Sequence, residues 1–453
     1  MEGLRVDLQE DVRVLLERRD LRALRAAIGE LEPPDLADLL RELDAPERAL
    51  VFRTLPRALA ADVFAELDAE SATALAAELT DDETRRLLAE LAPDDRTHLL
   101  EELPGLVVQK LLNLLPPEEL EEARTLLGYP EESVGRLMTP DYVAVKQHWT
   151  VAQALAHIRE RGRESETIDE IYVTDDRWRL LDAVPLAELV LADPDATVAT
   201  VMDESYVSVV ATEDRERAVE LIARYDRTAL PVVDPDGVLL GIVTIDDLLD
   251  VAEAEATEDI YLGAAIEPLA VAYRDASVGR LYRKRIVWLV SLVLVALLSS
   301  GVIALFEGTL ERTIALAFFI PLLIGAGGNT GAQSATLVVR ALATGDLRLR
   351  QWSQALAKEL TVGLVLGLTM GAASGLLGVV RGGVAVGVVV GLTMVAIVLV
   401  ANLVGASLPF LLTKVGLDPA VASSPLIATI MDAVGLLIYF TVATVVLGVV
   451  GGV

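Results

Sequence analysis

Apolar residues follow two different patterns on either side of residue 285. Before it they recur at helical or strand spacing among many charged residues, whereas from Ile286 onward they form long apolar runs. A run of about 20 residues is enough for a helix to cross ~30 Å of hydrocarbon. We therefore predict that residues 286–453 form an all-α domain with five transmembrane helices, at Ile286–Phe306, Thr313–Val339, Thr361–Val380, Val384–Leu412 and Pro425–Val453.

Basic residues predict the orientation of these helices. Arg280, Arg283, Lys284 and Arg285 directly precede the first apolar run. Because Lys and Arg are enriched in cytoplasmic segments next to membrane spans, they place this end and everything N-terminal to it in the cytoplasm. The sequence thus predicts a multi-pass protein of the cell (inner or plasma) membrane, with cytoplasmic N-terminal domains and an external C-terminus.

Charge separates the same two parts of the chain. Of its 68 acidic and 38 basic residues, 62 acidic and 31 basic ones lie in residues 1–285. This acidic module lacks the basic surface of a nucleic-acid-binding protein, so no nucleic-acid partner is expected. The chain has no cysteine, which excludes disulfides, thiolate metal sites and thiol nucleophiles.

Residues 1–130 are predicted to form an acidic helical domain. Short amphipathic segments recur about every 23 to 25 residues, a period typical of helix pairs stacked in a small solenoid. The segments are Leu36–Leu40, Leu59–Phe64, Thr84–Leu88 and Val108–Leu112.

Residues 131–252 alternate between helical and strand patterns. Short β-branched runs predict strands at Tyr142–Val145, Ile171–Thr174, Val207–Val210, Leu230–Val233 and Val238–Thr244. An internal duplication relates Leu137–Pro140 to Val201–Asp203, and each copy is followed by a strand, a helix and two strands. The region resembles a tandem pair of cystathionine-β-synthase (CBS) domains, which have an α/β fold.

The CBS resemblance implies ATP as one candidate ligand, because such pairs often bind adenine nucleotides. Thr244 and Asp247 match the family positions that hold ribose or phosphate. In the first copy, Pro185 and Glu188 stand where a hydroxyl residue and an Asp are usual. A structural CBS pair without a ligand is the alternative.

An acidic connecting helix is predicted for residues 253–285, between the CBS pair and the first apolar run. It overlaps a run, residues 246–259, in which seven acids occur within 14 residues without a base: Asp246, Asp247, Asp250, Glu253, Glu255, Glu258 and Asp259. Like charges four residues apart destabilise a helix, so counter-cations would stabilise this one. A solvated helix face is the alternative interpretation.

Within the second apolar run, Gly325–Gly331 is rich in glycine and is followed by Gln333 and Ser334. Glycines weaken a helix and allow another backbone to approach closely. One interpretation is a close-packed helix crossing. The other is irregular backbone along a watery pathway, which the polar residues favour.

Asp432 is the ionisable residue deepest within an apolar run. A carboxylate at that depth costs roughly 2.5–3.5 kcal/mol on insertion scales, so such residues usually face a cavity and mark an ion path. Ala428 and Ser424, one and two helical turns before it, leave room on the same face. Oxygen ligands without Cys or His favour Mg²⁺ or Ca²⁺ over Zn²⁺ or Cu²⁺. A protonated, hydrogen-bonded Asp is the alternative.

Together these parts resemble the MgtE family of magnesium channels over essentially the whole chain. The most specific motifs are Pro321–Thr336 with Arg340–Thr344, Ala401–Gly405, and Asp432 in its apolar run. Glu253–Asp259 is almost as distinctive.

The resemblance implies a homodimer with a pore on its two-fold axis, in which Mg²⁺ is both the transported and the regulating ion. Asp432 of each subunit would hold a largely hydrated Mg²⁺, helped by backbone oxygens of Ala428 and Ser424. A glycine-broken second span would line the pore with Gly328, Asn329 and Gln333. Cytoplasmic Mg²⁺ would close the channel by binding at Asp62, Asp94, Asp214, Glu216, Asp226, Asp247, Glu255, Glu258, Asp259 and Asp418.

Two other functions fit the sequence. A transporter could exchange Mg²⁺ for Na⁺ or H⁺, or a non-conducting membrane sensor could use the CBS pair to read an ion or a nucleotide. The sensor leaves Asp432 unexplained. An enzyme is disfavoured, and no glycine-rich phosphate loop of the ATPase type is present.

Overall fold

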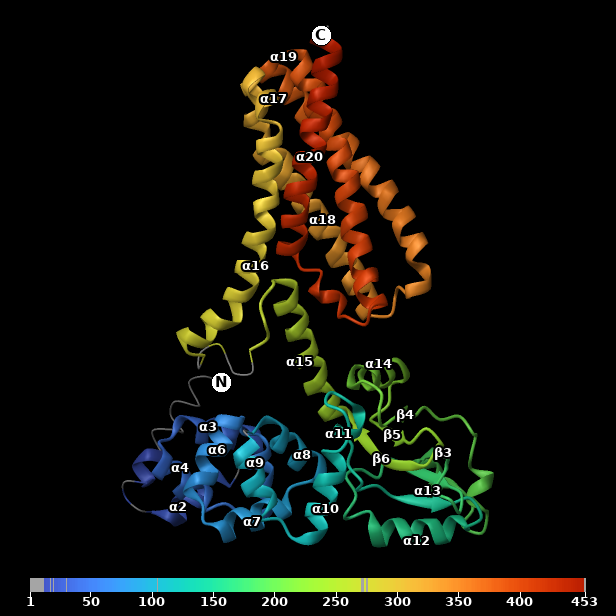
Figure 1. Cartoon of the computed structure of the whole chain (residues 1–453). Coiled ribbons are helices and arrows are strands. Elements are labelled where there is room, and N and C mark those ends of the chain that lie inside the picture. Colours follow the sequence, from blue (N-terminus) through green and yellow to red (C-terminus); the bar gives the residue numbers. More distant parts are fainter. Residues whose placement is uncertain are drawn as a thin grey trace. The chain divides into compact units, whose positions relative to one another are not determined.

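The computed structural model describes residues 12–16, 18, 20–29, 31–103, 105–269, 273 and 276–451. The rest of the predicted helical domain (residues 1–11, 17, 19, 30 and 104), part of 253–285, and the last two residues of the predicted fifth span lie outside these ranges. The chain divides into two compact units, Met1–Ala252 and Glu253–Val453. Within the described residues, strands occur in the first unit only (Figure 1).

Short helices build the N-terminal part of the first unit. They are α2 (Leu21–Ile28), α3 (Pro33–Glu42), α4 (Ala45–Phe52), α5 (Arg57–Ala65), α6 (Ala69–Glu78), α7 (Asp81–Glu90), α8 (Pro93–Glu102), α9 (Gly105–Leu112) and α10 (Pro117–Leu126). Several of these helices begin with a polar N-cap residue. The side chains of Asp44 and Asp68 accept backbone N–H groups of α4 and α6, and Thr80 forms a capping box with Glu83 at the start of α7.

Alternate helices of this part pack on one another. Helix α3 contacts α5, α5 contacts α7, and α4 contacts α6. The four predicted repeat segments lie in α3, α5, α7 and α9. Their apolar faces meet in one continuous core that includes Leu36, Leu40, Phe64 and Leu88, as expected for stacked helix pairs.

Two three-stranded sheets of identical topology follow. Strands β1 (Ala144–Lys146), β2 (Glu170–Thr174) and β3 (Leu180–Pro185) form the first, and β4 (Val209–Val210), β5 (Ala229–Val233) and β6 (Leu239–Thr244) the second. In each sheet the first pair is parallel and the second antiparallel. The crossover helices are α12 (Val151–Arg161) and α14 (Arg215–Tyr225); α11 (Val134–Leu137) precedes β1, and α13 (Leu186–Leu191) follows β3. The predicted duplication is therefore visible in the fold.

Strand β3 was not among the five predicted runs. This strand contains Asp182, which is only 1% exposed, and it ends at Pro185. An acidic residue and a proline are both unusual in a buried strand, so the sequence does not predict one here. The Asp182 carboxylate accepts the backbone N–H groups of Asp203 and Glu204, at 2.9 and 3.1 Å. This tertiary contact compensates the buried charge and could not be read from local spacing.

The acidic connecting helix has different bounds from the predicted 253–285. Helix α15 starts at Ile245, directly after β6, and ends at Gly263. Ala265 then has a positive φ of 57°, Pro268 follows, and the next helix starts at Val278 after the Ser277 cap. Because this turn interrupts the helical hydrogen bonds, the range 253–285 is not one helix, which corrects the prediction.

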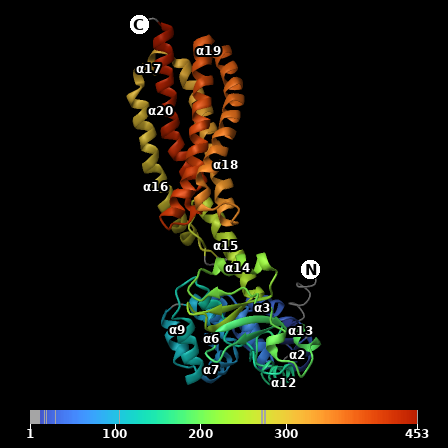
Figure 2. The same cartoon turned by 90° about the vertical axis from the view of Figure 1, so that its right-hand side faces the viewer.

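Long apolar helices make up the second unit (Figure 2). They are α16 (Val278–Leu305), α18 (Ile320–Ala343), α19 (Trp352–Lys414) and α20 (Ser424–Gly451), with the short α17 (Glu307–Arg312) after α16. Within the described residues, four helical stretches are long and apolar enough to cross a membrane.

The longest stretch consists of two helices that turn back on each other at Gly383. This residue has φ 82° and ψ 177°, a conformation available to glycine but outside the helical region. On either side of it, Gly371 faces Gly391 and Gly375 faces Gly387, so the two halves of α19 pack in opposite directions along closely spaced backbones. The predicted third and fourth spans correspond to these two halves.

The glycine-rich segment does not break its helix. Helix α18 runs without interruption from Ile320 to Ala343, which corrects the prediction of a broken second span. A Cβ atom on Gly327 would lie 2.6 Å from Ile397 Cγ2, and one on Gly331 would lie 2.8 Å from Ile427 Cγ2. The glycines therefore allow neighbouring helices to approach, which is the close-packed crossing.

Candidate functional site

Asp432 lies in the third turn of α20, on the face that also carries Ala428 and Ser424. Ser424 is exposed, and Ala428 and Asp432 are half-buried, so all three reach the surface of this chain. Within the described residues, the Asp432 carboxylate has neither a hydrogen bond nor an ion pair. Its charge is therefore not compensated inside one chain and is available to a cation.

Helix α18 meets α20 beside this face. A Cβ atom on Gly328 would lie 3.3 Å from the Ala428 Cβ, which is a tight contact. Asn329 and Gln333 are exposed and lie one turn apart on α18. The crossing therefore puts the turn that carries Asn329 next to the α20 turns that carry the predicted ion-binding residues.

A buried polar cluster ties α18 to both halves of α19. The Ser334 hydroxyl lies 2.9 Å from Glu359 Oε2 and 3.1 Å from the Asn402 carbonyl oxygen. The Asn402 amide donates to the Glu359 carbonyl oxygen at 3.3 Å. Ser334 and Asn402 are only 3% and 2% exposed. Because unpaired polar groups are costly at such depth, these bonds hold the three helical segments in one arrangement.

Sequence reasoning missed two members of this cluster. Glu359 lies between the predicted spans Thr313–Val339 and Thr361–Val380, and Asn402 enters the sequence analysis only as part of Ala401–Gly405. The available signal was an amide, Asn402, in an otherwise apolar run, and a carboxylate, Glu359, two residues before the apolar run that starts at Thr361. Their pairing depends on the reversal at Gly383, which spacing alone does not reveal.

In the first unit, acids of the helical domain and the CBS region gather in one place. We call Asp94, Asp95, Glu166, Asp246 and Asp247 the interdomain acid cluster. Asp94 is only 7% exposed. Burial, and then the like charges of Asp247, Asp95 and Glu166, raise the pKa of the Asp94 carboxyl well above its usual range. Such a cluster is stabilised by protons or by cations.

The pKa of the Asp247 carboxyl is raised as well. Burial raises the pKa of its carboxyl to about 7, although a 2.9 Å hydrogen bond from the Thr244 hydroxyl acts in the opposite direction. The charges of Asp246, Asp95 and Glu166 add to the increase. Asp62 lies close enough to raise the pKa of Asp95. The structure therefore brings together three predicted ligands, Asp62, Asp94 and Asp247.

Three members of this cluster, Asp95, Glu166 and Asp246, were not predicted as ligands. Asp95 and Asp246 adjoin predicted residues, but Glu166 follows α12 and carries no local signal. Among the described residues, no three His, Asp or Glu side chains are close enough to hold a bare metal ion together. Mg²⁺ usually keeps several waters and is bound directly by only one or two carboxylates.

A second acidic group lies at the other end of α15 and involves Asp259, Glu255 and Asp418. Burial, followed by the charges of Asp418 and Glu255, raises the pKa of the Asp259 carboxyl, whereas Arg340 lowers it. Glu258 belongs to the same turn of the helix and has an interaction of its own. These four predicted ligands therefore lie around one region of the second unit.

The remaining predicted ligands flank α14. Asp214 caps this helix by accepting the Glu216 N–H at 2.9 Å, and Asp226 ends it with a positive φ of 51°. Among the described residues, none of the three contributes to the raised pKa values of either acidic group. Asp214 and Asp226 therefore have local structural roles, and the chain does not bring them to the clusters.

The residues predicted to bind a nucleotide lie in acidic surroundings. The Thr244 hydroxyl is hydrogen-bonded to Asp247, which belongs to the interdomain acid cluster. Carboxylates at this density repel a triphosphate. Arg227, in the second copy, forms a 2.7 Å ion pair with Glu170 and is not free to neutralise one.

We expect the stability of the first unit to fall as pH rises towards 8 in the absence of divalent cations. The raised pKa of Asp247 means that the folded state retains a proton that the unfolded chain loses above pH ~4. This stabilisation is complete below that pH and is lost as pH rises through about 7. Thermal unfolding of the full-length protein in EDTA, from pH 5 to pH 8, would measure the loss, on the order of 1 kcal/mol or more.

Asp247→Asn should flatten this pH dependence, and millimolar Mg²⁺ should restore stability at pH 8. The matched variant Asp236→Asn, in the exposed β5–β6 turn, should keep the wild-type slope. An unfolding temperature that rises with pH in EDTA would contradict this account of the interdomain acid cluster.

Comparisons with known proteins agree with these features. The chain matches the family described as a divalent cation transporter, MgtE, over residues 320–442, and the MgtE intracellular N domain over 13–132. CBS domains match residues 134–195 and 198–254. The chain is 44% identical over 339 residues to the magnesium transporter MgtE of Thermus thermophilus, covering 75% of each chain. It is 32% identical to that of Bacillus subtilis, covering 74% of each.

Solved structures resemble the first unit. The cytosolic domain of the Mg²⁺ channel MgtE in complex with ATP is 40% identical, with a TM-score of 0.51, covering 55% of this chain and 99% of that one. The soluble part of a magnesium transporter is 30% identical, with a TM-score of 0.52, covering 56% and 99%.

Proposed function

The chain belongs to the MgtE family of divalent cation transporters, and on that premise we propose that it is a homodimeric Mg²⁺ channel closed by cytoplasmic Mg²⁺. Its relatives are named as transporters, not enzymes. The observation that carries the proposal is the Asp432 carboxylate, uncompensated within the described chain and set in an apolar helix. An unpaired charge at such a position is typical of an ion path.

Five membrane spans are part of the proposal, because the reversal at Gly383 divides α19 into two. Arg280, Arg283, Lys284 and Arg285 precede the apolar part of α16 and place that end in the cytoplasm. An odd number of spans then puts the C-terminus outside. The acidic groups on both ends of α15 would all face cytoplasmic Mg²⁺.

In the pore, a two-fold axis would bring two Asp432 carboxylates opposite each other. Two carboxylates that are too far apart to coordinate one ion directly would suit a hydrated Mg²⁺, since this ion loses its waters reluctantly. Backbone oxygens near Ala428 and Ser424 would hold those waters. The inside-negative potential supplies about 2.3 kcal/mol per charge per 100 mV, doubled for a divalent ion, so uptake needs no ATP.

Closure would follow from the acidic groups. Without Mg²⁺, the carboxylates of the interdomain acid cluster repel one another, and so do Glu255, Asp259 and Asp418. Bound Mg²⁺ would bridge both sets and favour one position of α15, which joins them. The ion thereby biases a two-state assembly towards the state that binds it better. The acidic surroundings of Thr244 and Asp247 favour a cation over a nucleotide phosphate at this position.

The test is Mg²⁺ uptake by wild-type protein in proteoliposomes under an inside-negative potassium diffusion potential. The proposal expects uptake at low internal Mg²⁺ that stops as internal Mg²⁺ rises. Uptake that occurs only with an opposing Na⁺ or H⁺ gradient would show an exchanger instead. A lack of uptake by correctly oriented protein would favour a non-conducting sensor.

A further inference from the structure

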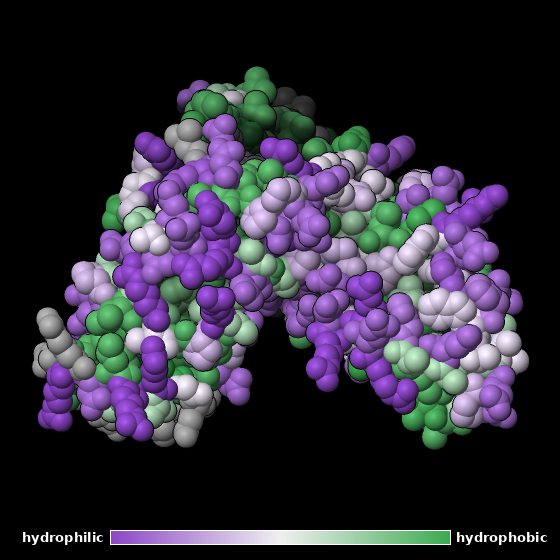
Figure 3. Space-filling model, turned by 90° about the horizontal axis from the view of Figure 1, so that it is seen from below, coloured by the Kyte–Doolittle hydropathy of each residue, from purple (hydrophilic) through white to green (hydrophobic). Residues whose placement is uncertain are grey.

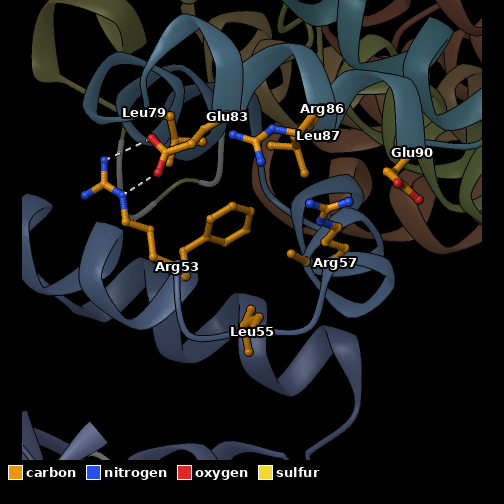
Figure 4. A pocket seen from close by; sticks show the side chains of 10 residues that line it. Arg53, Leu55, Arg57, Leu79, Glu83, Arg86, Leu87 and Glu90 are labelled. Atoms are coloured by element: carbon orange, nitrogen blue, oxygen red, sulfur yellow. Dashed lines mark hydrogen bonds and ion pairs between the residues drawn. The ribbon is translucent and has the colours of Figure 1, made fainter.

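A cavity of about 250 Å³ opens in the helical domain, between α4, α5 and α7. Figure 4 shows three arginines around it: Arg53 at the end of α4, Arg57 at the start of α5, and Arg86 on α7. This concentration of basic side chains is unusual in a module where acids outnumber bases two to one. Figure 3 shows the molecule from below, where hydrophilic residues surround several hydrophobic patches.

Only one of the three arginines is neutralised. Arg53 forms two hydrogen bonds with the Glu83 carboxylate, at 3.0 and 3.2 Å. This pairing, with the Thr80 hydrogen bonds, lowers the pKa of the Glu83 carboxyl to about 2, so the pair is already complete. It closes one side of the cavity and leaves no charge to attract a ligand there.

Arg57 and Arg86 have no carboxylate partner among the described residues. Arg57 makes no hydrogen bond or ion pair there, and Arg86 donates only Nε–H, to the Asp82 carbonyl oxygen at 3.0 Å. Glu90 also lines the cavity but pairs with neither arginine. Two guanidinium groups thus keep their terminal N–H donors free at one opening (Figure 4).

Between the two arginines and the Arg53–Glu83 pair, the wall is apolar. It is formed by Phe52 and Leu87, both largely buried, and by the partly exposed Leu55 and Leu79. Helix α5 begins at this wall, and Pro56 before it provides no side-chain cap. The uncapped first turn of the helix adds a partial positive charge on the same side as Arg57.

We propose that this cavity binds a small phosphate monoester with an aromatic or apolar body. The phosphate would take the fork-shaped donors of Arg57 and Arg86, and the body would cover Phe52 and Leu87. Arginine suits phosphate because its planar donors match two oxygens at once. The volume is slightly below the usual 300–1,000 Å³ of ligand pockets, which limits the occupant to a small molecule.

The net negative charge of the module does not prevent such binding. At physiological ionic strength charges beyond about 8 Å are largely screened. Among the charges that line the cavity, the guanidinium groups of Arg57 and Arg86 outnumber the single Glu90 carboxylate, because Arg53 and Glu83 neutralise each other. The site is separate from the proposed ion path, and none of its lining residues belongs to the acidic groups described above.

The experiment is saturation-transfer NMR of phenyl phosphate with the full-length protein in zwitterionic lipid nanodiscs. Methyl phosphate provides the anion without the ring, benzyl alcohol the ring without the anion, and empty nanodiscs the background. We expect phenyl phosphate to bind more tightly than either partial probe. In Arg57→Gln/Arg86→Gln its affinity should fall by about tenfold or more, equivalent to ~1.4 kcal/mol.

Arg124→Gln is the matched control, because Arg124 is an exposed arginine of the same domain, on α10, without an ion pair in the described structure. It should bind phenyl phosphate like the wild type. Thermal unfolding of both variants would show that the domain remains folded. The proposal is overturned if phenyl phosphate gives no signal above background, or if the double variant binds it as well as the wild type.

Discussion

Asp432→Asn should reduce Mg²⁺ uptake by roughly 100-fold or more, because two carboxylate charges opposite a divalent ion contribute several kcal/mol. Asn keeps the shape and hydrogen-bonding oxygen of the side chain but removes its charge. The Asp432 carboxylate has no partner within the described chain, so its loss should not disturb the fold. Uptake into proteoliposomes at a fixed inside-negative potential would measure the effect.

Asp346→Asn gives the same chemical change in the exposed segment between α18 and α19, outside the proposed ion path. It should transport like the wild type. Both variants should unfold at the wild-type temperature, which separates loss of transport from loss of structure. Substantial uptake by a well-folded Asp432→Asn protein would remove this carboxylate from the ion path.

Gly405→Ala should prevent the transmembrane helices from packing. The added Cβ would lie 2.2 Å from the Gly331 carbonyl oxygen and 3.1 Å from the Ser334 Cβ. The first of these is a backbone atom of α18, so relief requires the two helices to separate. Separation would also break the Ser334 contacts with Glu359 and Asn402. Overpacking typically costs about 1–3 kcal/mol, and the broken bonds add to it.

The unfolding temperature of the purified protein should therefore drop by at least several degrees, at about 2–4 °C per kcal/mol for a domain of this size. Thermal unfolding with size-exclusion chromatography would measure it. Gly325→Ala is the control, because a Cβ there meets nothing within 4 Å although the residue lies on the same helix as Gly331. Equal stability of the two variants would refute the close crossing.

The sequence predicted the elements that depend on local spacing. Helical periodicity indicated the repeats in α3, α5, α7 and α9, and β-branched runs indicated five of six strands. Long apolar runs indicated the membrane helices, because their length relates directly to bilayer thickness. Strand β3 escaped this reasoning, since its buried Asp182 is stabilised by backbone N–H groups distant in the chain.

The role of the glycines depended on tertiary structure. Glycine weakens an isolated helix, so Gly325–Gly331 was equally consistent with a broken span. In the bundle, Gly327 and Gly331 face neighbouring side chains that leave no room for a Cβ atom, and a Cβ atom on Gly328 would be in tight contact with Ala428. Close packing against these neighbours favours a continuous helix. The sequence of α18 alone could therefore not decide between a continuous and a broken helix.

The residues with the chemistry for cations, Asp432 in an apolar run and the acids around α15, could be identified from the amino-acid sequence. Which of these residues meet depends on the folded chain. It brings Asp62, Asp94 and Asp247 together, adds Asp95 and Glu166, and leaves Asp214 and Asp226 in local caps. The reason is physical: a charge is visible in the sequence, whereas its burial and its like-charged neighbours arise from segments far apart in the chain.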